Sequence, residues 1–338
     1  MTVSANARGG LPAALPAYAC YDLGTAALAA GVRVRFYDVD PHTLGPDEAT
    51  LRHAINAGVS CVVLVHPYGI PQDARMVSTL ARGAGALVIE DLAQADGARV
   101  SGEPLGSAAD YLVRSFGRGK GWTGGGGGAL LVAEDAPAPA QLTTSVWSTT
   151  QSARFTLSTL AQWGLGRPAL YAIPSAFPPL GLGETRFKQP TEPREMHPSQ
   201  VRLAVATAHL QEAERAHRRR TAEYYNAIDI ESFGWLRPAV AAAADCGWLR
   251  YPVRGALPAL ETWKSLGIAR GYPKALPHLS ALAQIITGQE SVRGAEELAR
   301  SLWTLPTHGH VTDRWRARIA RWLSAHAPAA RKSNGGTD

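Results

Sequence analysis

The sequence "SFGRGKGWTGGGGGALL" occupies residues 115–131, where a single lysine, Lys120, stands between two glycines and precedes a run of five consecutive glycines. Glycine runs are costly to order, so they persist where a backbone must approach another group closely or where the chain is disordered. Strand-like apolar runs flank the stretch, "YLVRSF" at 111–116 and "GALLVAED" at 128–135. The role of this stretch therefore decides both the fold and the function.

Two more buried strands are expected upstream, "SCVVLVH" at 60–66 and "ALVIED" at 86–91. Between them, Met76, Leu80 and Ala84 recur at helical spacing. Strands that alternate with helices indicate βαβ units and a mainly parallel sheet, that is, an α/β fold. Ligands bind such open sheets at the carboxyl ends of the strands. Two polar residues, Asp91 and Ser115, fall at such ends.

The C-terminal part of the chain carries two helix patterns, one from residue 198 to about 228 and one at 312–325. The second pattern places Trp315, Ile319 and Trp322 on one helical face. The segments between the two helices are of mixed strand and helix character. They predict a smaller C-terminal α+β domain beside the large sheet domain.

The domain organisation predicted from these patterns has three parts. Residues 1–195 form the large domain, 196–326 a linking helix and the small C-terminal domain, and 327–338 a disordered tail. Residues 146–190 are apolar and contain several prolines and glycines, and their sequence assigns them no role.

The composition narrows the class of protein. Hydrophobic residues make up 46% and charged residues 18% of the 338 residues, which excludes global disorder. The net charge is +6, but the basic residues are scattered apart from a run at 218–220, so we expect no nucleic-acid partner. Three widely spaced cysteines exclude a disulfide framework and a metal site of cysteine pairs. Without a signal peptide or a long apolar run, we expect a cytoplasmic protein with no membrane span.

Three mechanisms could use a lysine among glycines. A Walker P-loop needs Ser or Thr after its lysine, whereas Gly121 follows Lys120. A dinucleotide fingerprint, GxGxxG, is matched by Gly119, Gly121 and Gly124, but it requires a helix to follow, and a strand is expected here. A lysine that forms a Schiff base with a flat cofactor needs little bulk around it, which glycine neighbours provide. An exposed, flexible basic loop is the alternative to all three.

Residues near the lysine favour a pyridoxal phosphate site. The cofactor needs a carboxylate at its ring nitrogen, so that the ring can accept electrons. Asp91 supplies one at a strand end, Gln94 is available for the ring oxygen, and Ser115 is available for the phosphate. His66, also at a strand end, is expected to be a structural hydrogen-bonding residue.

A series of motifs resembles the DegT/DnrJ/EryC1/StrS aminotransferases, which are fold type I enzymes that use pyridoxal phosphate. The match runs in order from about residue 16 to residue 325. "LPAYACYDLGTAALAAGVRVRFYDVD" resembles the family's strand, turn and D-[VI]-D, and "VHPYGIPQD" its V-H-x-Y-G-x-P-x-D. "IEDLAQADGA" is similar to its E-D-x-A-Q-x-x-G-A and "SFGRGK" to its S-F-x-x-x-K. "SLGIARGYP" and "LPTHGHVTD" resemble its C-terminal motifs.

The resemblance implies a role for each matching residue. Lys120 would form the Schiff base and act as the acid and base of the proton shift. The other implied cofactor contacts are Asp91 at the ring nitrogen, Gln94 at the ring oxygen, Ser115 at the phosphate, and Ala93 and Cys20 against the ring. The substrate-side positions are Tyr272 and His278. Apart from the resemblance, Arg118 stands beside the lysine, where it either binds a substrate anion or faces solvent.

The resemblance also implies an activity. The chain would be a pyridoxal-phosphate-dependent aminotransferase that moves an amino group from glutamate or glutamine to a nucleotide-linked keto sugar. The pathway would be polysaccharide or secondary-metabolite sugar biosynthesis. Because Lys120 is a lysine rather than a histidine, transamination is favoured over the family's dehydratase branch. A homodimer is implied, since fold type I enzymes usually build the site across a dimer interface.

The sequence departs from the family pattern at its start. We expect a shortened N-terminal segment without the Gly-Thr or Gly-Ser turn that holds the cofactor phosphate. Gly24 and Thr25 match that turn by letter, but in register they follow a strand. The family's Asn-Tyr-Arg has no counterpart. A non-catalytic or cofactor-poor paralogue that serves as a dimer partner or regulator is therefore the alternative function.

Overall fold

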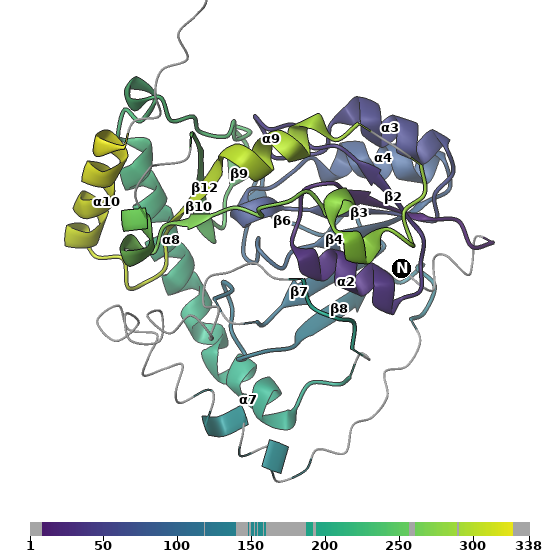
Figure 1. The fold of residues 1–338 in the computed structure, drawn as a ribbon. Helices are drawn as coiled ribbons and strands as arrows, with labels where there is room; N and C mark the ends of the chain where they lie inside the picture. The colour runs from purple at the N-terminus through teal and green to yellow at the C-terminus, as the bar shows by residue number, and fades with distance from the viewer. Residues whose placement is uncertain are drawn as a thin grey trace, which may run out of the picture.

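The computed structural model of the chain describes residues 9–117, 119–139, 187–191, 194–256, 261–288 and 291–326, with positions 148, 150, 151, 153, 155–157 and 159. Within these residues, a large sheet with helices on both faces stands beside a smaller group of strands and helices (Figure 1). Arg118, the predicted tail at 327–338 and most of the segment 146–190 lie outside the described residues.

The large sheet carries the strands that the sequence predicted. Among the described residues, its order is β2-β1-β3-β4-β7-β8, and every pairing is parallel except the antiparallel one between β7 and β8. The prediction of an α/β fold with a mainly parallel sheet is therefore confirmed. The strands are β1 (Ala13–Pro16), β2 (Val34–Tyr37), β3 (Cys61–Val65), β4 (Leu87–Asp91), β7 (Tyr111–Ser115) and β8 (Gly128–Val132).

Helices cover both faces of this sheet. On one face, α3 (Glu48–Asn56) and α4 (Ala74–Gly83) bury their apolar sides against the alternate residues of β1, β3 and β4. On the other face lie α2 (Tyr21–Ala29) and segments from the C-terminal part of the chain. Both faces are apolar and covered, which is what a parallel sheet requires.

The helix predicted between β3 and β4 is present as α4. It ends at Gly83, so Ala84, the last residue of the predicted pattern, is its exposed C-cap. Val77 and Ala81, one helical turn apart, are fully buried, and Met76 and Leu80 pack beside them. The spacing predicted the helix, and the direction in which α4 faces the sheet decides which of its residues are fully buried.

A second, antiparallel sheet forms in the C-terminal part of the chain. Its order is β10 (Arg250–Arg254), β12 (Leu302–Pro306) and β11 (Ala269–Arg270). Against it, α10 (Asp313–Ala325) buries Ile319 and Trp322 and partly buries Trp315. The predicted face of this helix is therefore confirmed.

Short elements connect these layers. β5 (Arg99–Val100), β6 (Glu103–Pro104) and β9 (Ala244–Asp245) form a small antiparallel sheet. Another helix, α9 (Arg293–Ser301), precedes β12. Short 3₁₀ turns are η1 (Pro67–Gly69), η4 (Glu231–Phe233), η5 (Glu261–Leu266), η6 (Leu276–His278) and η7 (Ser280–Leu282). None of the described helices combines the length and apolar composition that crossing a bilayer requires.

The predicted long helix is present as an almost unbroken rod. It consists of α7 (Pro198–Thr207), η3 (Ala208–Leu210) and α8 (Gln211–Asn226). The rod runs from the β7–β8 hairpin to the C-terminal core (Figure 1). Val201 and Val205, two of the apolar positions that indicated this helix, are exposed on α7.

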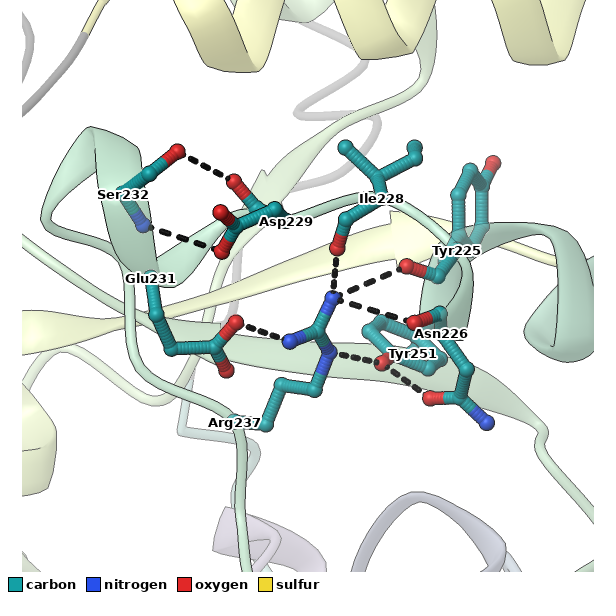
Figure 2. Close-up of polar contacts among 8 residues, drawn as sticks. All are labelled: Tyr225, Asn226, Ile228, Asp229, Glu231, Ser232, Arg237 and Tyr251. Carbon is teal, nitrogen blue, oxygen red and sulfur yellow. Dashed lines mark hydrogen bonds and ion pairs between the residues drawn. The ribbon is translucent and has the colours of Figure 1, made fainter.

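An arginine closes the C-terminal end of α8 (Figure 2). The guanidinium of Arg237 donates to the carbonyl of Tyr225 at 3.1 Å, to the carbonyl of Ile228, and to the hydroxyl of Tyr251 at 3.0 Å. Glu231 pairs with its remaining nitrogen. The last carbonyls of a helix have no partner within the helix, and this single side chain supplies one.

A carboxylate ties the large sheet to α9. Asp38 follows β2, and its two oxygens accept from the backbone N–H groups of Gly294 and Ala295 at 2.8 and 2.9 Å. These N–H groups lie in the first turn of α9, where a negative charge is stabilising. The C-terminal part of the chain is thereby held against the face of the sheet that carries α2.

Candidate functional site

Lys120 lies in the turn that joins β7 to β8. The turn closes on Phe116, whose carbonyl accepts from the N–H groups of Gly124 and Gly126 at 2.9 and 3.1 Å and whose N–H donates to the Gly127 carbonyl at 2.9 Å. Gly119 has a φ of +72°, a conformation that glycine adopts without strain. The described residues of the turn thus form a hydrogen-bonded hairpin, and a strand follows it. The dinucleotide fingerprint, which requires a helix at this place, is therefore wrong for this stretch.

The five-glycine run has a second use besides the turn. A Cβ at Gly126 would lie 2.5 Å from the Gln200 side-chain nitrogen, and one at Gly127 would lie 2.5 Å from Met196 Cγ. Gln200 belongs to α7, and Met196 directly precedes it. The missing side chains therefore let the hairpin and α7 approach each other closely.

The space around the lysine is also narrow. A Cβ at Gly117 would lie 3.2 Å from Ser115 Oγ and 3.7 Å from Lys120 Cγ. The Gly117 N–H donates to Ser115 Oγ at 3.3 Å. Ser115 and Lys120 are therefore neighbours across one turn, as the sequence predicted from the strand end.

Aromatic and ionic contacts fix this turn from outside. The Trp122 indole donates to the Ala204 carbonyl of α7 at 2.8 Å, and its ring packs edge-on against Phe116 at 4.7 Å between centroids. Arg114 lies over the same indole and pairs with Asp96. Lys120 is thus carried on a loop whose neighbours are anchored on two sides.

Asp91 is the last residue of β4 and pairs with β3 on one side and β7 on the other. Burial raises the pKa of its carboxyl, while the Ala93 N–H at 2.8 Å and the charge of Lys120 act against that rise. A carboxylate whose pKa is raised by desolvation favours a positively charged partner, which offsets the cost of burying its charge. Asp91, Ala93 and Lys120 are therefore brought together as predicted.

Cys20 lies at the same place, at the N-cap of α2. Burial raises the pKa of its thiol, and the neighbouring Asp22 carboxylate adds to that rise. Lys120 lowers the same pKa and Asp91 raises it, so all three side chains lie within electrostatic range of one another. The position that the sequence assigned to a ring contact is therefore at the site.

Gln94 follows β4 and is bonded at both ends of its amide. Its Oε1 accepts from the Tyr68 backbone N–H at 2.7 Å, and its Nε2 donates to the Tyr272 hydroxyl at 2.5 Å. Burial raises the pKa of the Tyr272 phenol, and Cys20 and Asp91 also act on it. Tyr272, predicted as a substrate-side residue, thus lies beside the predicted cofactor contacts.

Tyrosine rings surround Tyr272. The ring centroids of Tyr18, Tyr21 and Tyr68 lie 5.3, 5.9 and 6.4 Å from its own. Tyr68 was not singled out from the sequence, although it stands inside a motif that was. Its backbone has a φ of 57°, which no pattern in the sequence indicates.

His66 is a structural residue, as expected. Its Nδ1 accepts from the Gln72 N–H at 2.9 Å, so Nε2 carries the proton and donates to Glu90 Oε1 at 2.9 Å. Both side chains are fully buried. Glu90 faces the side of the sheet opposite to Asp91, because alternate residues of β4 face opposite sides.

Other predicted positions stand apart from this site. His278 lies on η6 and pairs with Glu296 at 3.5 Å. Gly24 lies inside α2 against Leu282, so it does not form a helix start that could hold a phosphate. Within the part of the chain that the structure describes, no three His, Cys, Asp or Glu side chains are grouped as for a metal ion.

A cavity of about 390 Å³ lies on the opposite face of β7 and is lined by Leu92, Leu112 and Arg114 and by residues of α8. The arginines that line it from α8, Arg215 and Arg218, are paired with carboxylates. Neither Asp91 nor Lys120 lines this cavity, although Gly121, the residue after Lys120, does.

Comparison with known proteins shows which family this part of the chain is similar to. Residues 22–160 match the DegT/DnrJ/EryC1/StrS aminotransferase family. Protein MosB of Rhizobium meliloti is 34% identical over 117 residues, which are 35% of this chain and 23% of MosB. A UDP-N-acetyl-3-dehydro-alpha-D-glucosamine 3-aminotransferase of Acidithiobacillus ferrooxidans is 34% identical over 122 residues, 36% of this chain and 33% of that protein. The matches thus span a third or less of these curated relatives.

The whole fold also has a known counterpart. The crystal structure of a DegT DnrJ EryC1 StrS aminotransferase from Brucella abortus aligns over 96% of this chain and 83% of its own, with a TM-score of 0.71 and 18% identity. The predicted fold type I architecture is therefore confirmed.

Proposed function

We propose, from the match of residues 22–160 to the DegT/DnrJ/EryC1/StrS aminotransferase family, that this chain is a pyridoxal-phosphate-dependent aminotransferase. The observation that carries the proposal is the convergence of Lys120, Asp91 and Cys20, each of which alters the electrostatics of another. The three residues come from the hairpin turn, the end of β4 and the start of α2.

The residues present fit the cofactor. The desolvated Asp91 carboxyl suits a protonated ring nitrogen, because such a partner offsets the cost of burying its charge. Beside Lys120, Gly117 keeps side-chain bulk away from the lysine, since a Cβ there would lie 3.7 Å from Lys120 Cγ, at van der Waals contact. When bound, pyridoxal phosphate supplies an electron-accepting ring next to the reacting carbon.

Each residue has a distinct task in this proposal. Lys120 would hold the cofactor through its Nζ and, once released, would take the proton from the donor's α-carbon and return it to the carbon on the other side of the amino nitrogen, two atoms away. Asp91 keeps the ring nitrogen protonated. Gln94 donates to the ring oxygen, and Ser115 Oγ donates to the phosphate. Ala93 and Cys20 are the contacts to the ring.

The substrates follow from the family and from one relative. The Acidithiobacillus relative is named for a nucleotide-linked keto sugar, which supports a substrate of that class here. Glutamate or glutamine is the amino donor, and the product serves polysaccharide or secondary-metabolite sugar biosynthesis. Tyr272, His278 and Arg118 are the substrate-side residues of this proposal. Tyr272 is supported by its bond to Gln94, whereas His278 pairs with Glu296 apart from the other site residues.

The active form in this proposal is a homodimer. Its support is an exposed apolar surface on the edge strand β8 and on α7, where Leu130, Leu131 and Val205 are 49%, 46% and 69% exposed. Exposed clusters of large apolar side chains mark interaction surfaces. Light scattering after gel filtration should give twice the mass of the chain, and L131D/V205D should give a monomer.

The proposed domains are residues 1–195 and 196–326, the first of which binds the cofactor. Their support is that the chain has two apolar cores. One core lies on the large sheet and also takes in later residues such as Leu276, Leu282 and Leu298, and the other surrounds Trp235 and Trp303 beside the C-terminal sheet.

The test of the function is a titration of the purified protein with pyridoxal phosphate. A visible absorbance band should appear, and borohydride reduction followed by peptide mapping should locate the added mass on Lys120. Lys120→Ala should abolish the band, whereas the matched variant Lys264→Ala, in η5 of the C-terminal part, should retain it. A band that survives Lys120→Ala unchanged would refute the proposal.

A turnover assay separates the two functions considered. Glutamate or glutamine together with a nucleoside-diphosphate-linked keto sugar should yield an amino sugar and the corresponding oxo acid. A protein that carries the cofactor on Lys120 and converts neither amino donor would instead be the non-catalytic paralogue.

A further inference from the structure

We propose that Tyr272 is a positioning residue: its hydroxyl fixes the amide of Gln94 so that a nitrogen, and not the carbonyl oxygen, faces the cofactor's ring oxygen. The inference rests on the proposed function for the cofactor. The orientation of the Gln94 amide by the Tyr272 hydroxyl involves only residues of the protein, so it can be tested without the cofactor.

The orientation of the Gln94 amide follows from its two partners. A backbone N–H can only donate, so the end of the amide that meets the Tyr68 N–H at 2.7 Å must be the oxygen. The other end, Nε2, therefore points to the Tyr272 hydroxyl at 2.5 Å. An amide nitrogen has two hydrogens, so one remains for a ligand after Tyr272 has taken the other.

The Tyr68 N–H is aimed at Gln94 by an uncommon backbone. Tyr68 has φ 57° and ψ 14°, in the left-handed region that a tyrosine rarely adopts. The next residue, Gly69, holds this turn against the C-terminal part of the chain. Its carbonyl accepts from the Gly247 N–H at 2.8 Å, and a Cβ on it would lie 2.5 Å from the Trp248 nitrogen.

The Tyr272 ring is held in place without help from its hydroxyl. The backbone N–H of Tyr272 donates to the Tyr18 hydroxyl at 2.8 Å. The preceding Gly271 is so close that a Cβ would clash with that hydroxyl. Tyr272→Phe therefore removes the contact with Gln94 and leaves the packing of the ring intact, which makes it a clean test.

The Tyr272 phenol remains neutral at ordinary pH. Burial raises its pKa well above the usual range, and the nearby Cys20 thiol adds to that rise. A neutral hydroxyl accepts from Gln94 Nε2 throughout the pH range in which an aminotransferase works. The contact is thus present whenever the site is in use.

Tyr272 and Gln94 are 178 positions apart in the sequence. Gln94 follows a strand of the large sheet, whereas Tyr272 follows β11 of the C-terminal sheet. The orientation of a cofactor contact therefore depends on the docking of the C-terminal part of the chain.

The first experiment needs no cofactor. Hydrogen exchange of the Tyr68 amide should be faster in Tyr272→Phe than in the unaltered protein, because Gln94 loses the bond that holds its oxygen on that amide. The matched control is Tyr225→Phe, which removes a buried hydroxyl bonded to the Pro306 carbonyl at 3.0 Å. It should leave the Tyr68 amide unchanged. Equal protection of that amide in Tyr272→Phe and the unaltered protein would overturn the inference.

The second experiment measures the loaded protein. Tyr272→Phe should weaken pyridoxal phosphate binding about 2- to 12-fold, the range for one neutral hydrogen bond, and should shift the pH midpoint of the visible band. In a Gln94→Leu background the same substitution should have no further effect, since its target is gone. An undiminished effect in that background would contradict the inference. Failure of the unaltered protein to bind the cofactor would refute the proposed function, while the exchange experiment would still judge the Tyr272–Gln94 contact.

Discussion

The Trp122 indole nitrogen lies 2.8 Å from the Ala204 carbonyl oxygen, 82 positions away in the sequence. This bond connects the turn that carries Lys120 to the middle of α7. It forms next to the closest approach of the hairpin and the helix, where glycines replace side chains.

Trp122→Phe removes that bond and retains an aromatic ring beside Phe116. We expect the amides of residues 117–125 to exchange faster, and the free energy of unfolding to fall by about 1 kcal/mol. Trp315→Phe is the control, because the Trp315 indole donates in the same way to the Leu266 carbonyl at 3.0 Å. It should cost a similar free energy without altering exchange in the lysine turn. Unchanged exchange of that turn in Trp122→Phe would show that the bond does not hold it.

Asp91→Asn should separate stability from function. Burial raises the pKa of the Asp91 carboxyl in the folded protein, so its contribution to stability is full in acid and is lost as pH rises through that pKa. At neutral pH the charged Asp91 carboxylate lowers the free energy of unfolding by about 1.4 kcal/mol for each unit by which folding raises its pKa. Asparagine keeps the oxygen that accepts from Ala93 without the charge.

The cofactor-free Asp91→Asn protein should therefore unfold at a higher urea concentration than the unaltered protein at pH 7, and at the same concentration in strong acid. Its stabilisation by added pyridoxal phosphate should be lost. Asp135→Asn, on the exposed turn after β8, should change neither curve. A lower stability of Asp91→Asn at pH 7 would contradict the expected direction.

Alkylation of Cys20 tests the charges at the site. Its thiol pKa is raised by burial and by Asp22 and is lowered by Lys120. Iodoacetamide should thus react slowly at pH 7.5, more slowly in Lys120→Ala, and faster in Asp22→Asn, as followed by mass spectrometry. The buried Cys246, whose pKa burial raises to about 12, is the internal reference and should react last. A faster reaction in Lys120→Ala would mean that the lysine does not act on the thiol.

The last glycine of the run has the least freedom to change. A Cβ on Gly128 would collide with the Arg114 carbonyl oxygen of the paired strand, and a backbone atom cannot move aside cheaply. Gly128→Ala should destabilise the protein by about 1–3 kcal/mol in urea unfolding. Gly83→Ala, at the end of α4 with open space around it, should be neutral or stabilising by up to about 1 kcal/mol. A Gly128→Ala protein as stable as the unaltered protein would show that β7 and β8 separate at this point.

Arg237→Lys tests the closure of α8 seen in Figure 2. A lysine ammonium cannot reach the carbonyls, the Tyr251 hydroxyl and Glu231 together. We expect a loss of about 2 kcal/mol, as for a hydrogen bond to a charged group. Arg52→Lys, in an exposed pair with Glu48, should stay within about 0.5 kcal/mol. Cofactor binding should be unaffected by either change.

The sequence predicted the sheet well because its strands are short, apolar and bounded by turns. β3 is a continuous apolar run and β4 begins with one, and a parallel sheet with two covered faces needs such runs. The convergence of Asp91 and Ser115 was predictable for the same reason, since both follow from the rule that neighbouring parallel strands end at one edge.

Contacts between distant segments could not be predicted. Nothing in the local sequence pairs Gln94 with Tyr272, and nothing marks Tyr68 as a residue with a left-handed backbone. The glycine run was interpreted as clearance for the lysine and for the turn. Its further use, the close approach of α7, depends on a helix about 70 residues later in the chain.

The rod of α7, η3 and α8 limits where this chain can be joined to a relative in a chimeric protein. The proposed boundary at residue 195 precedes α7, yet this helix contacts the lysine hairpin through Ala204 while α8 packs Tyr225 into the C-terminal core. A fragment that ends at the boundary would lose its hairpin support, and a chimera joined there would set a foreign helix against the glycines. A crossover that preserves both contacts must lie before the hairpin or beyond Asn226, so the rod is inherited with the lysine it supports.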